Sequence, residues 1–82
     1  MYAHLLADNN KTVGTRETIK AIEKDRAKMV FVAKDAEKHV TLPVVNACHD
    51  KSISVVEVES MTELGKACSV QVKTAVAACL KG

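Results

Sequence analysis

The residues best suited to chemistry in this chain stand together at the start of a predicted helix. A β-favouring residue is followed by Gly14 and Thr15, and then by a segment compatible with a helix. The first backbone N–H groups of a helix have no partner inside it and point outward. Arg16, Glu17 and Lys20 add side-chain donors and acceptors near the same end. Such an end can hold an anion or read the edge of a base. Taken alone, however, the pattern is more simply that of an ordinary capped helix.

Other residue pairs that could support catalysis are poorly placed. Cys48 precedes His49, but neighbours on a helix point about 100° apart, and a buried structural cysteine is the favoured interpretation. Glu57 and Glu59 share one face of a predicted strand, where exposure to solvent explains them. The three cysteines form no Cys-x-x-Cys and share no ligand spacing with the three histidines. We therefore expect no enzyme activity, no metal site and no cofactor, with reduced cysteines as in cytosolic proteins.

Composition limits the architecture and the class of partner. A chain of 82 residues has no room for a second core, so we predict a single domain over residues 1–82. With one Phe, one Tyr and no Trp, the core must be aliphatic, and aromatic stacking on single strands is not expected. A net charge of +2 permits nucleic-acid binding without arguing for it. Since no signal peptide or membrane-spanning run is visible, we expect a cytoplasmic protein with no membrane partner.

Apolar patterns and turn residues alternate along the chain. They predict a helical turn over residues 2–8, an edge strand over 11–13, a helix over 15–24, a strand over 29–33, a helix over 38–50, a strand over 52–58, a helix over 61–67, a connection over 69–72, and a strand or helix over 74–80, where the small residues favour a strand. This alternation predicts an α/β protein with helices on both sides of a small sheet.

The first predicted helix has an apolar side and a basic side. Ile19 and Ile22 would face inward, while Arg16, Lys20 and Lys24 fall four residues apart and form an exposed basic stripe.

A proline complicates the second long helix. Pro43 must lie in its first turn or divide it, because an interior proline removes a backbone hydrogen bond. On that assumption Leu42, Val45 and either Cys48 or His49 would face inward.

Three shorter motifs complete the pattern. Ser60, followed three positions later by Glu63, predicts an N-cap for the helix over 61–67. Lys34 and Asp35 follow a buried strand, where α/β proteins often place functional groups, although a simple polar exit from the strand is favoured. Residues 70–72 hold two valines around a polar residue. These valines could offer an apolar surface to a partner or enter the core, and the residues alone leave both open.

A resemblance brings these motifs together. Gly14-Thr15-Arg16-Glu17-x-x-Lys20 resembles the Gly-Thr-Asn-Glu-x-x-Lys motif of the kink-turn RNA-binding family, which includes the archaeal ribosomal protein L-seven-Ae, its relative L-thirty-e and small ribosome-associated bacterial proteins. Residues 27–36 resemble the family's second strand and its exit, and residues 58–67 its Leu-Gly-x-Ala helix. Ser69-Val70-Gln71-Val72 resembles its Gly-Ile-Glu-Val loop. The likeness covers about residues 11–80, with the motifs in the same order and spacing.

The resemblance implies a fold, a ligand and a site. The fold is an α/β/α sandwich of three layers around a four-stranded mixed sheet. The ligand is a duplex RNA kinked at a short bulge beside sheared G·A pairs. The implied RNA-binding residues are Gly14, Thr15, Arg16, Glu17, Lys20, Ser69, Val70, Gln71 and Val72.

Each part of this site has an implied role. Gly14 and Thr15 would let the backbone approach the RNA closely. Glu17 would accept a hydrogen bond from a guanine edge, and Lys20 would meet guanine acceptors or phosphate. The two valines of the loop would shield an unstacked bulge base from water.

Two positions depart from the family pattern. Arg16 stands where many members have asparagine and could still donate to guanine O6 and N7; Ser69 replaces the loop glycine. We therefore predict a monomeric, ribosome-associated protein that recognises kink-turns in ribosomal RNA or in an mRNA or riboswitch element. The alternative is a ribosome-associated module that contacts proteins and binds little RNA specifically.

Overall fold

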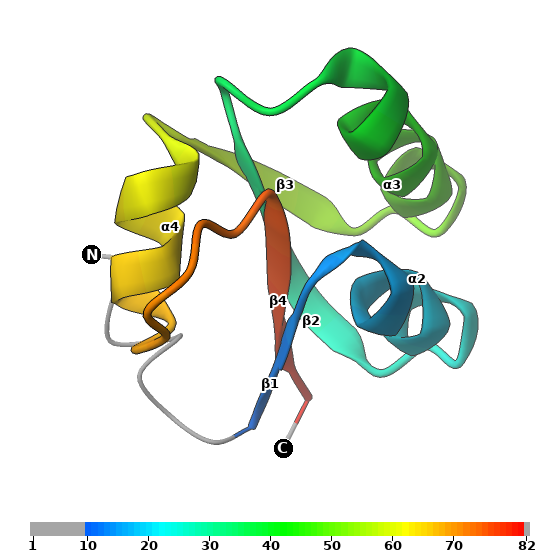
Figure 1. The fold of residues 1–82 in the computed structure, drawn as a ribbon. Coiled ribbons are helices and arrows are strands. Elements are labelled where there is room, and N and C mark those ends of the chain that lie inside the picture. Colours follow the sequence, from blue (N-terminus) through cyan, green and yellow to red (C-terminus); the bar gives the residue numbers. More distant parts are fainter. Residues whose placement is uncertain (1–9, 82) are drawn as a thin grey trace.

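Four strands form a single mixed sheet in the computed structural model, which describes residues 10–81. The elements are β1 (Lys11–Val13), α2 (Thr15–Glu23), β2 (Ala27–Ala33), α3 (Lys38–Asp50), β3 (Ser54–Val58), α4 (Met61–Ala67) and β4 (Val76–Leu80). The strand order is β1-β4-β2-β3, with β2 and β3 parallel and β4 antiparallel to both of its neighbours. Figure 1 shows how these elements follow one another.

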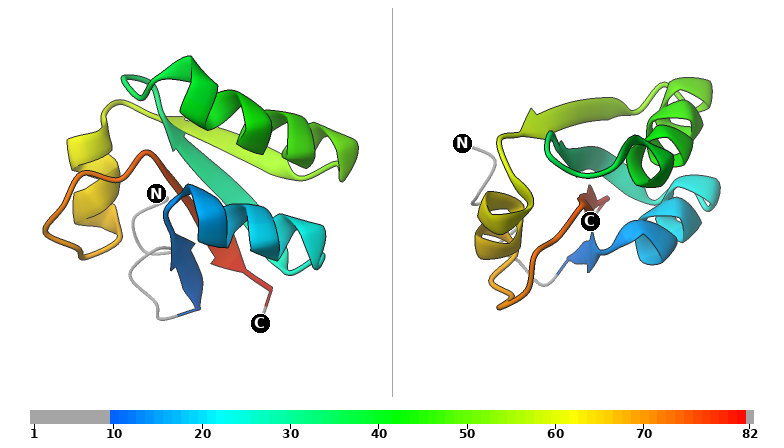
Figure 2. Two further views of the ribbon diagram at one scale, coloured as in Figure 1. Left: turned by 45° about the vertical axis from the view of Figure 1, so that its right-hand side comes forward. Right: turned by 45° about the horizontal axis from the view of Figure 1, so that its top comes forward.

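Helices cover both faces of this sheet. Figure 2 shows α2 and α3 together on one face and α4 on the other, which confirms the predicted three-layer arrangement around a four-stranded mixed sheet. The helical turn predicted over residues 2–8 lies outside the described residues. No helix within residues 10–81 is both long and apolar enough to cross a membrane.

Alternation along the two central strands builds a core on each side. Phe31 and Ala77 pack towards α4, while Val30 and Ala78 pack towards α2 and α3, and all four are fully buried. Because both faces of β2 are covered, this strand is apolar almost throughout. The sequence leaves the segment over 74–80 open between strand and helix, and its residues Val76–Leu80 form a strand. The alanines of β4 let the helices approach the sheet closely.

The inward face of α3 differs from the prediction. Thr41, Val44 and Cys48 are buried, whereas Leu42 is 50% exposed and His49 is exposed. The buried residues follow the spacing i, i+3 and i+7 of one continuous helix face.

The proline neither begins nor divides this helix, contrary to the prediction. Pro43 lies in the second turn of α3. Pro43 is exposed, so the one helical donor that it removes is lost on the solvent side, where water can replace the bond. The inward residues Thr41 and Val44 each lie one position before the predicted Leu42 and Val45, and Val45 is only half-buried. The predicted inward position of Cys48 is confirmed.

Candidate functional site

The N-terminus of α2 depends on the backbone conformation of Gly14. This residue has φ 100° and ψ 158°, a backbone conformation that residues with a Cβ rarely adopt. A Cβ built on Gly14 would meet nothing within 4 Å, so conformation and not crowding requires glycine here. The Gly14 N–H donates to the Val76 carbonyl over 2.8 Å, and the Gly14 carbonyl accepts from the Thr18 N–H over 3.1 Å. These bonds fix the start of α2 beside the start of β4.

A hydrogen bond between two threonine hydroxyl groups connects the first turns of α2 to β1. The Oγ1 atoms of Thr12 on β1 and Thr18 on α2 lie 2.9 Å apart, and Thr18 is fully buried. Sequence reasoning missed this contact. Its only signal is a threonine on the inward side of a helix that directly follows a strand with another threonine.

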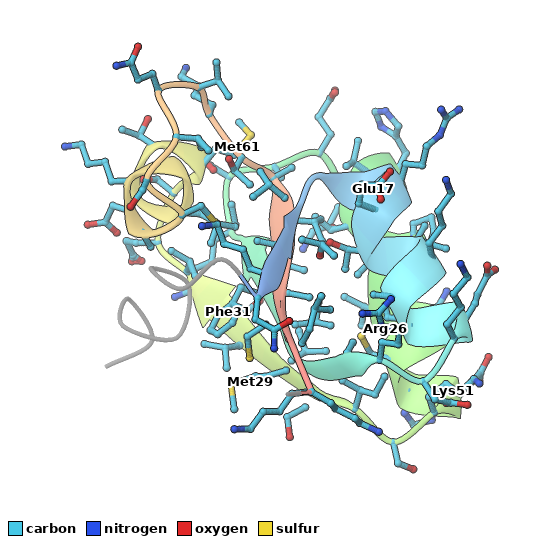
Figure 3. All side chains as sticks on the ribbon, turned by 90° about the horizontal axis from the view of Figure 1, so that it is seen from below. Glu17, Arg26, Met29, Phe31, Lys51 and Met61 are labelled. Carbon is cyan, nitrogen blue, oxygen red and sulfur yellow. The ribbon has the colours of Figure 1, made fainter. Side chains whose placement is uncertain are left out.

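The charged side chains at this end project into solvent. Arg16, Glu17 and Lys20 are exposed, and Figure 3 shows Glu17 near the start of α2. The Lys20 Nζ lies 4.0 Å from the Glu17 carboxylate, with about three-fifths of each side chain exposed. An exposed pair at this distance is weak, so both groups are available to a ligand. Lys24 is also exposed, which confirms the predicted basic stripe.

The second half of the predicted site is carried by α4, a short helix that is capped twice. The Ser60 Oγ accepts from the Glu63 N–H over 3.1 Å, as the sequence pattern predicts. The Asp35 carboxylate accepts from the Met61 N–H over 2.8 Å, which satisfies another unpaired donor at the start of the helix. The Lys34 ammonium pairs with Glu59 over 3.5 Å. The polar exit from β2 thus has a structural task, which is to hold α4.

The loop over residues 69–73 is fastened along α4. The Val70 N–H donates to the Gly65 carbonyl and the Thr74 N–H to the Met61 carbonyl, each over 3.1 Å. Gly65 permits this approach, because a Cβ at that position would lie only 2.3 Å from the Val72 carbonyl oxygen. Real Cβ atoms do not come so close to backbone atoms, so the loop can take this position only over a glycine.

The structure gives the two loop valines different environments. Val70 is half-buried and packs against the core on the α4 side of the sheet, whereas Val72 is 68% exposed. Of the two interpretations left open by the sequence, burial therefore applies to Val70 and an outward apolar surface to Val72. Ser69 and Gln71 are exposed.

Ser69 adopts the conformation that a glycine would favour. Its φ of 62° is left-handed, so the serine preserves the backbone turn at a cost of about 1 kcal/mol. We expect Ser69→Gly to raise the free energy of unfolding by up to about 1 kcal/mol, measured by denaturant titration. Ser52→Gly is the matched control, because Ser52 has φ 58° in a different turn. A loss of stability on Ser69→Gly alone would mean that the Ser69 side chain stabilises the loop.

The two halves of the predicted site meet through β4. The Ala75 carbonyl accepts from the Ala33 N–H over 2.9 Å, and the next carbonyl, that of Val76, accepts from the Gly14 N–H. The loop over 69–73 thus leads directly to the strand end that holds the start of α2, as Figure 2 also shows. The exposed start of α2 and the loop that carries the exposed Val72 are therefore both connected to the beginning of β4.

Within residues 10–81, the structure favours neither a nucleophilic cysteine nor a metal site. Cys48 is fully buried, and burial raises the pKa of its thiol, so a thiolate nucleophile is disfavoured there. Its neighbour His49 is exposed. No group of three or more histidine, cysteine or acidic side chains within residues 10–81 is arranged to hold a metal ion.

Comparison with known proteins gives consistent matches. An RNA-binding protein of Geobacillus stearothermophilus, YbxF, is 36% identical over 80 residues, which is 98% of each chain. RNA-binding protein TTE2299 of Caldanaerobacter subterraneus is 40% identical over 68 residues, or 83% of each chain.

Solved structures agree with these matches. The Giardia lamblia 15.5 kDa RNA-binding protein superposes with a TM-score of 0.89 at 32% identity, covering 98% of this chain and 68% of its own. A Bacillus halodurans protein of unknown function shares the fold at 19% identity, with a TM-score of 0.86. The model of the ribosomal protein L7Ae/L30e/S12e/Gadd45 family matches residues 4–82, a span that includes the α2 start, α4 and the loop over 69–73. The chain belongs to this family.

Proposed function

We propose that this chain is a non-enzymatic RNA-binding protein that recognises kink-turns. The observation that carries the proposal is the bond of 2.8 Å from the Gly14 N–H to the Val76 carbonyl, which ties the exposed start of α2 to the beginning of β4, the strand into which the exposed loop leads. The names of the bacterial relatives and of the Giardia protein, all described as RNA-binding, support the same class of ligand.

Each half of this surface suits a different part of a kinked duplex. At the α2 end, Glu17 accepts from the amino or imino edge of guanine, and Lys20 donates to guanine acceptors or to phosphate. Gly14 and Thr15 bring the backbone close to the RNA. In the loop, Val72 covers an unstacked base of the bulge, since its exposed apolar surface gains from leaving water. Ser69, Val70 and Gln71 hold and flank that surface.

Arg16 adds a donor at the position where many family members carry asparagine. Its side chain is exposed, and no ion pair within residues 10–81 restrains it. A guanidinium can donate two parallel bonds to guanine O6 and N7. We propose that Arg16 contributes base contacts and not only charge to the complex.

A gel-shift comparison tests the proposed function. We expect the protein to bind a kink-turn RNA more tightly than a duplex of equal length in which the sheared G·A pairs are replaced by Watson–Crick pairs. The affinity should fall steeply as salt rises, because phosphate contacts release counterions. Equal affinity for both RNAs would contradict recognition of the kink-turn.

The exposure of Val72 supports a second candidate function. A side chain that is 68% exposed could contact a protein, as in a ribosome-associated interaction module. Affinity for such a partner would change little with salt, because an apolar contact is not screened by ions. Titration of the intact protein against RNA and against ribosomal particles at two salt concentrations separates the two functions. For the RNA-binding function we also propose a monomer that acts in the cytoplasm in association with the ribosome.

A further inference from the structure

Two threonine hydroxyl groups meet between β1 and α2, on a side of the helix that is otherwise apolar. The buried side of α2 consists of Thr18, Ala21 and Ile22. Thr12 on β1 is paired with Ala78 on β4, and Ala78 packs on the side of the sheet that α2 covers, so Thr12 faces the helix. The Oγ1 atoms of Thr12 and Thr18 lie 2.9 Å apart. We call this contact the threonine pair.

Stability alone gives little reason for a hydrogen bond at this place. A hydrogen bond inside a protein replaces bonds to water, so its net contribution is small, and replacing both partners by apolar groups of the same shape is close to neutral. A hydrogen bond differs from an apolar contact because it is directional, since its length and its angle must both be right. The threonine pair therefore holds α2 at one rotation about the helix axis.

The rotation of α2 decides where its exposed side chains lie. The bond from Gly14 to Val76 fixes the position of the helix start, and the threonine pair, about one turn further along, fixes the rotation. Side chains reach about 5–6 Å from a helix axis, so a rotation by about 20° would move the tip of Glu17 or Lys20 by about 2 Å. A hydrogen bond to a base edge tolerates only about a few tenths of an ångström, whereas the attraction of a charge to phosphate changes little over such a distance.

We infer that Thr12 and Thr18 are positioning residues for RNA recognition. Their hydrogen bond sets the direction in which Glu17 meets a guanine edge, and it thereby determines how strongly the protein prefers kink-turn RNA to other duplexes. This inference rests on the proposed function. It assigns part of the specificity to a contact on the buried side of the helix.

Two changes at the threonine pair separate orientation from stability. The double variant Thr12→Val/Thr18→Val removes both hydroxyl groups and leaves neither one unpaired, whereas Thr18→Ser keeps the hydroxyl and loses one buried methyl group. We expect the double variant to keep the parental free energy of unfolding, while its preference for kink-turn RNA over the duplex without G·A pairs falls by about fivefold or more. We expect Thr18→Ser to be less stable and yet to keep the parental preference.

A control and a coupling measurement complete the test. Thr41→Val is the matched control, because Thr41 is a buried threonine on the inward side of α3, and it should leave the preference unchanged. Adding Glu17→Ala to the parent and to the double variant shows whether the threonine pair acts through Glu17. Since the double variant already misplaces this carboxylate, the added change should reduce its affinity for kink-turn RNA less than it reduces that of the parent.

The outcomes separate the inference from the proposed function. A double variant with the parental preference, a preference that follows stability across all variants, or equal losses on Glu17→Ala in both backgrounds would overturn the inference and leave the proposed function standing. If the parent protein binds both RNAs equally, the proposed function is wrong and the inference falls with it.

Discussion

A Glu17→Lys protein is expected to bind kink-turn RNA more weakly than the parent, although the substitution makes the protein more basic. The expected loss is about 1–3 kcal/mol, or roughly 5- to 150-fold in affinity, because a lysine cannot accept a hydrogen bond from a guanine edge. General attraction to phosphate predicts the opposite sign, since the added charge would strengthen binding. The direction of the change therefore distinguishes base recognition from non-specific attraction.

Two control measurements sharpen this result. On a duplex without G·A pairs, Glu17→Lys should strengthen binding, because only the phosphate attraction remains. Lys20→Gln should weaken binding to the kink-turn by a similar 1–3 kcal/mol or so, whereas Lys24→Gln, one turn further along the same exposed stripe, should have a smaller effect. Stronger binding of Glu17→Lys to both RNAs would place base recognition elsewhere on the molecule.

Gly65→Ala is expected to destabilise the protein, although alanine is the better helix former. Helix propensity alone predicts a gain of about 1 kcal/mol for this change inside α4. The new Cβ would lie 2.3 Å from the Val72 carbonyl oxygen, so the loop must move away from the helix. Overpacking of this kind costs about 1–3 kcal/mol. We expect a lower free energy of unfolding and weaker RNA binding, measured by denaturant titration and gel shift.

Hydrogen exchange shows whether the loop has moved in this variant. The amides of Val70 and Thr74, which bond to Gly65 and Met61, should exchange faster than in the parent. The amide of Leu64, which bonds to Ser60 within the helix, serves as the internal control and should change little. Parental stability together with parental exchange at Val70 and Thr74 would show that the loop tolerates the extra methyl group.

Local patterns predicted most of the elements correctly. The strand Lys11–Val13 and the helix Met61–Ala67 agree with their predicted bounds, because a glycine and an N-cap serine mark where each boundary falls. The helix Lys38–Asp50 also has the predicted bounds, but its buried face was misplaced. Pro43 removes only one hydrogen bond of the helix. Which face of the helix is buried is decided by the packing of the whole helix against the sheet and α2.

The environment of each loop valine could not be predicted in the same way. Val70 and Val72 have the same side chain and stand two residues apart, yet one packs on the core and the other projects into solvent. The difference arises from the contact of the loop with Gly65, a residue that the sequence indicates only as part of a helix. The same holds for Asp35, whose bond to the Met61 N–H spans 26 positions of the chain.

The sequence by itself determined the alternating elements, the exposed basic side of α2, the glycine at its start and the likeness to one protein family. These features depend on local conformation and on hydrophobic periodicity, and both are determined by residues close together in the sequence. Only the tertiary structure decided that the loop over 69–73 lies along α4 and leads into the strand that holds the start of α2. These arrangements depend on contacts between distant segments, such as Gly14 with Val76 and Gly65 with Val72, which exist only once the chain has folded.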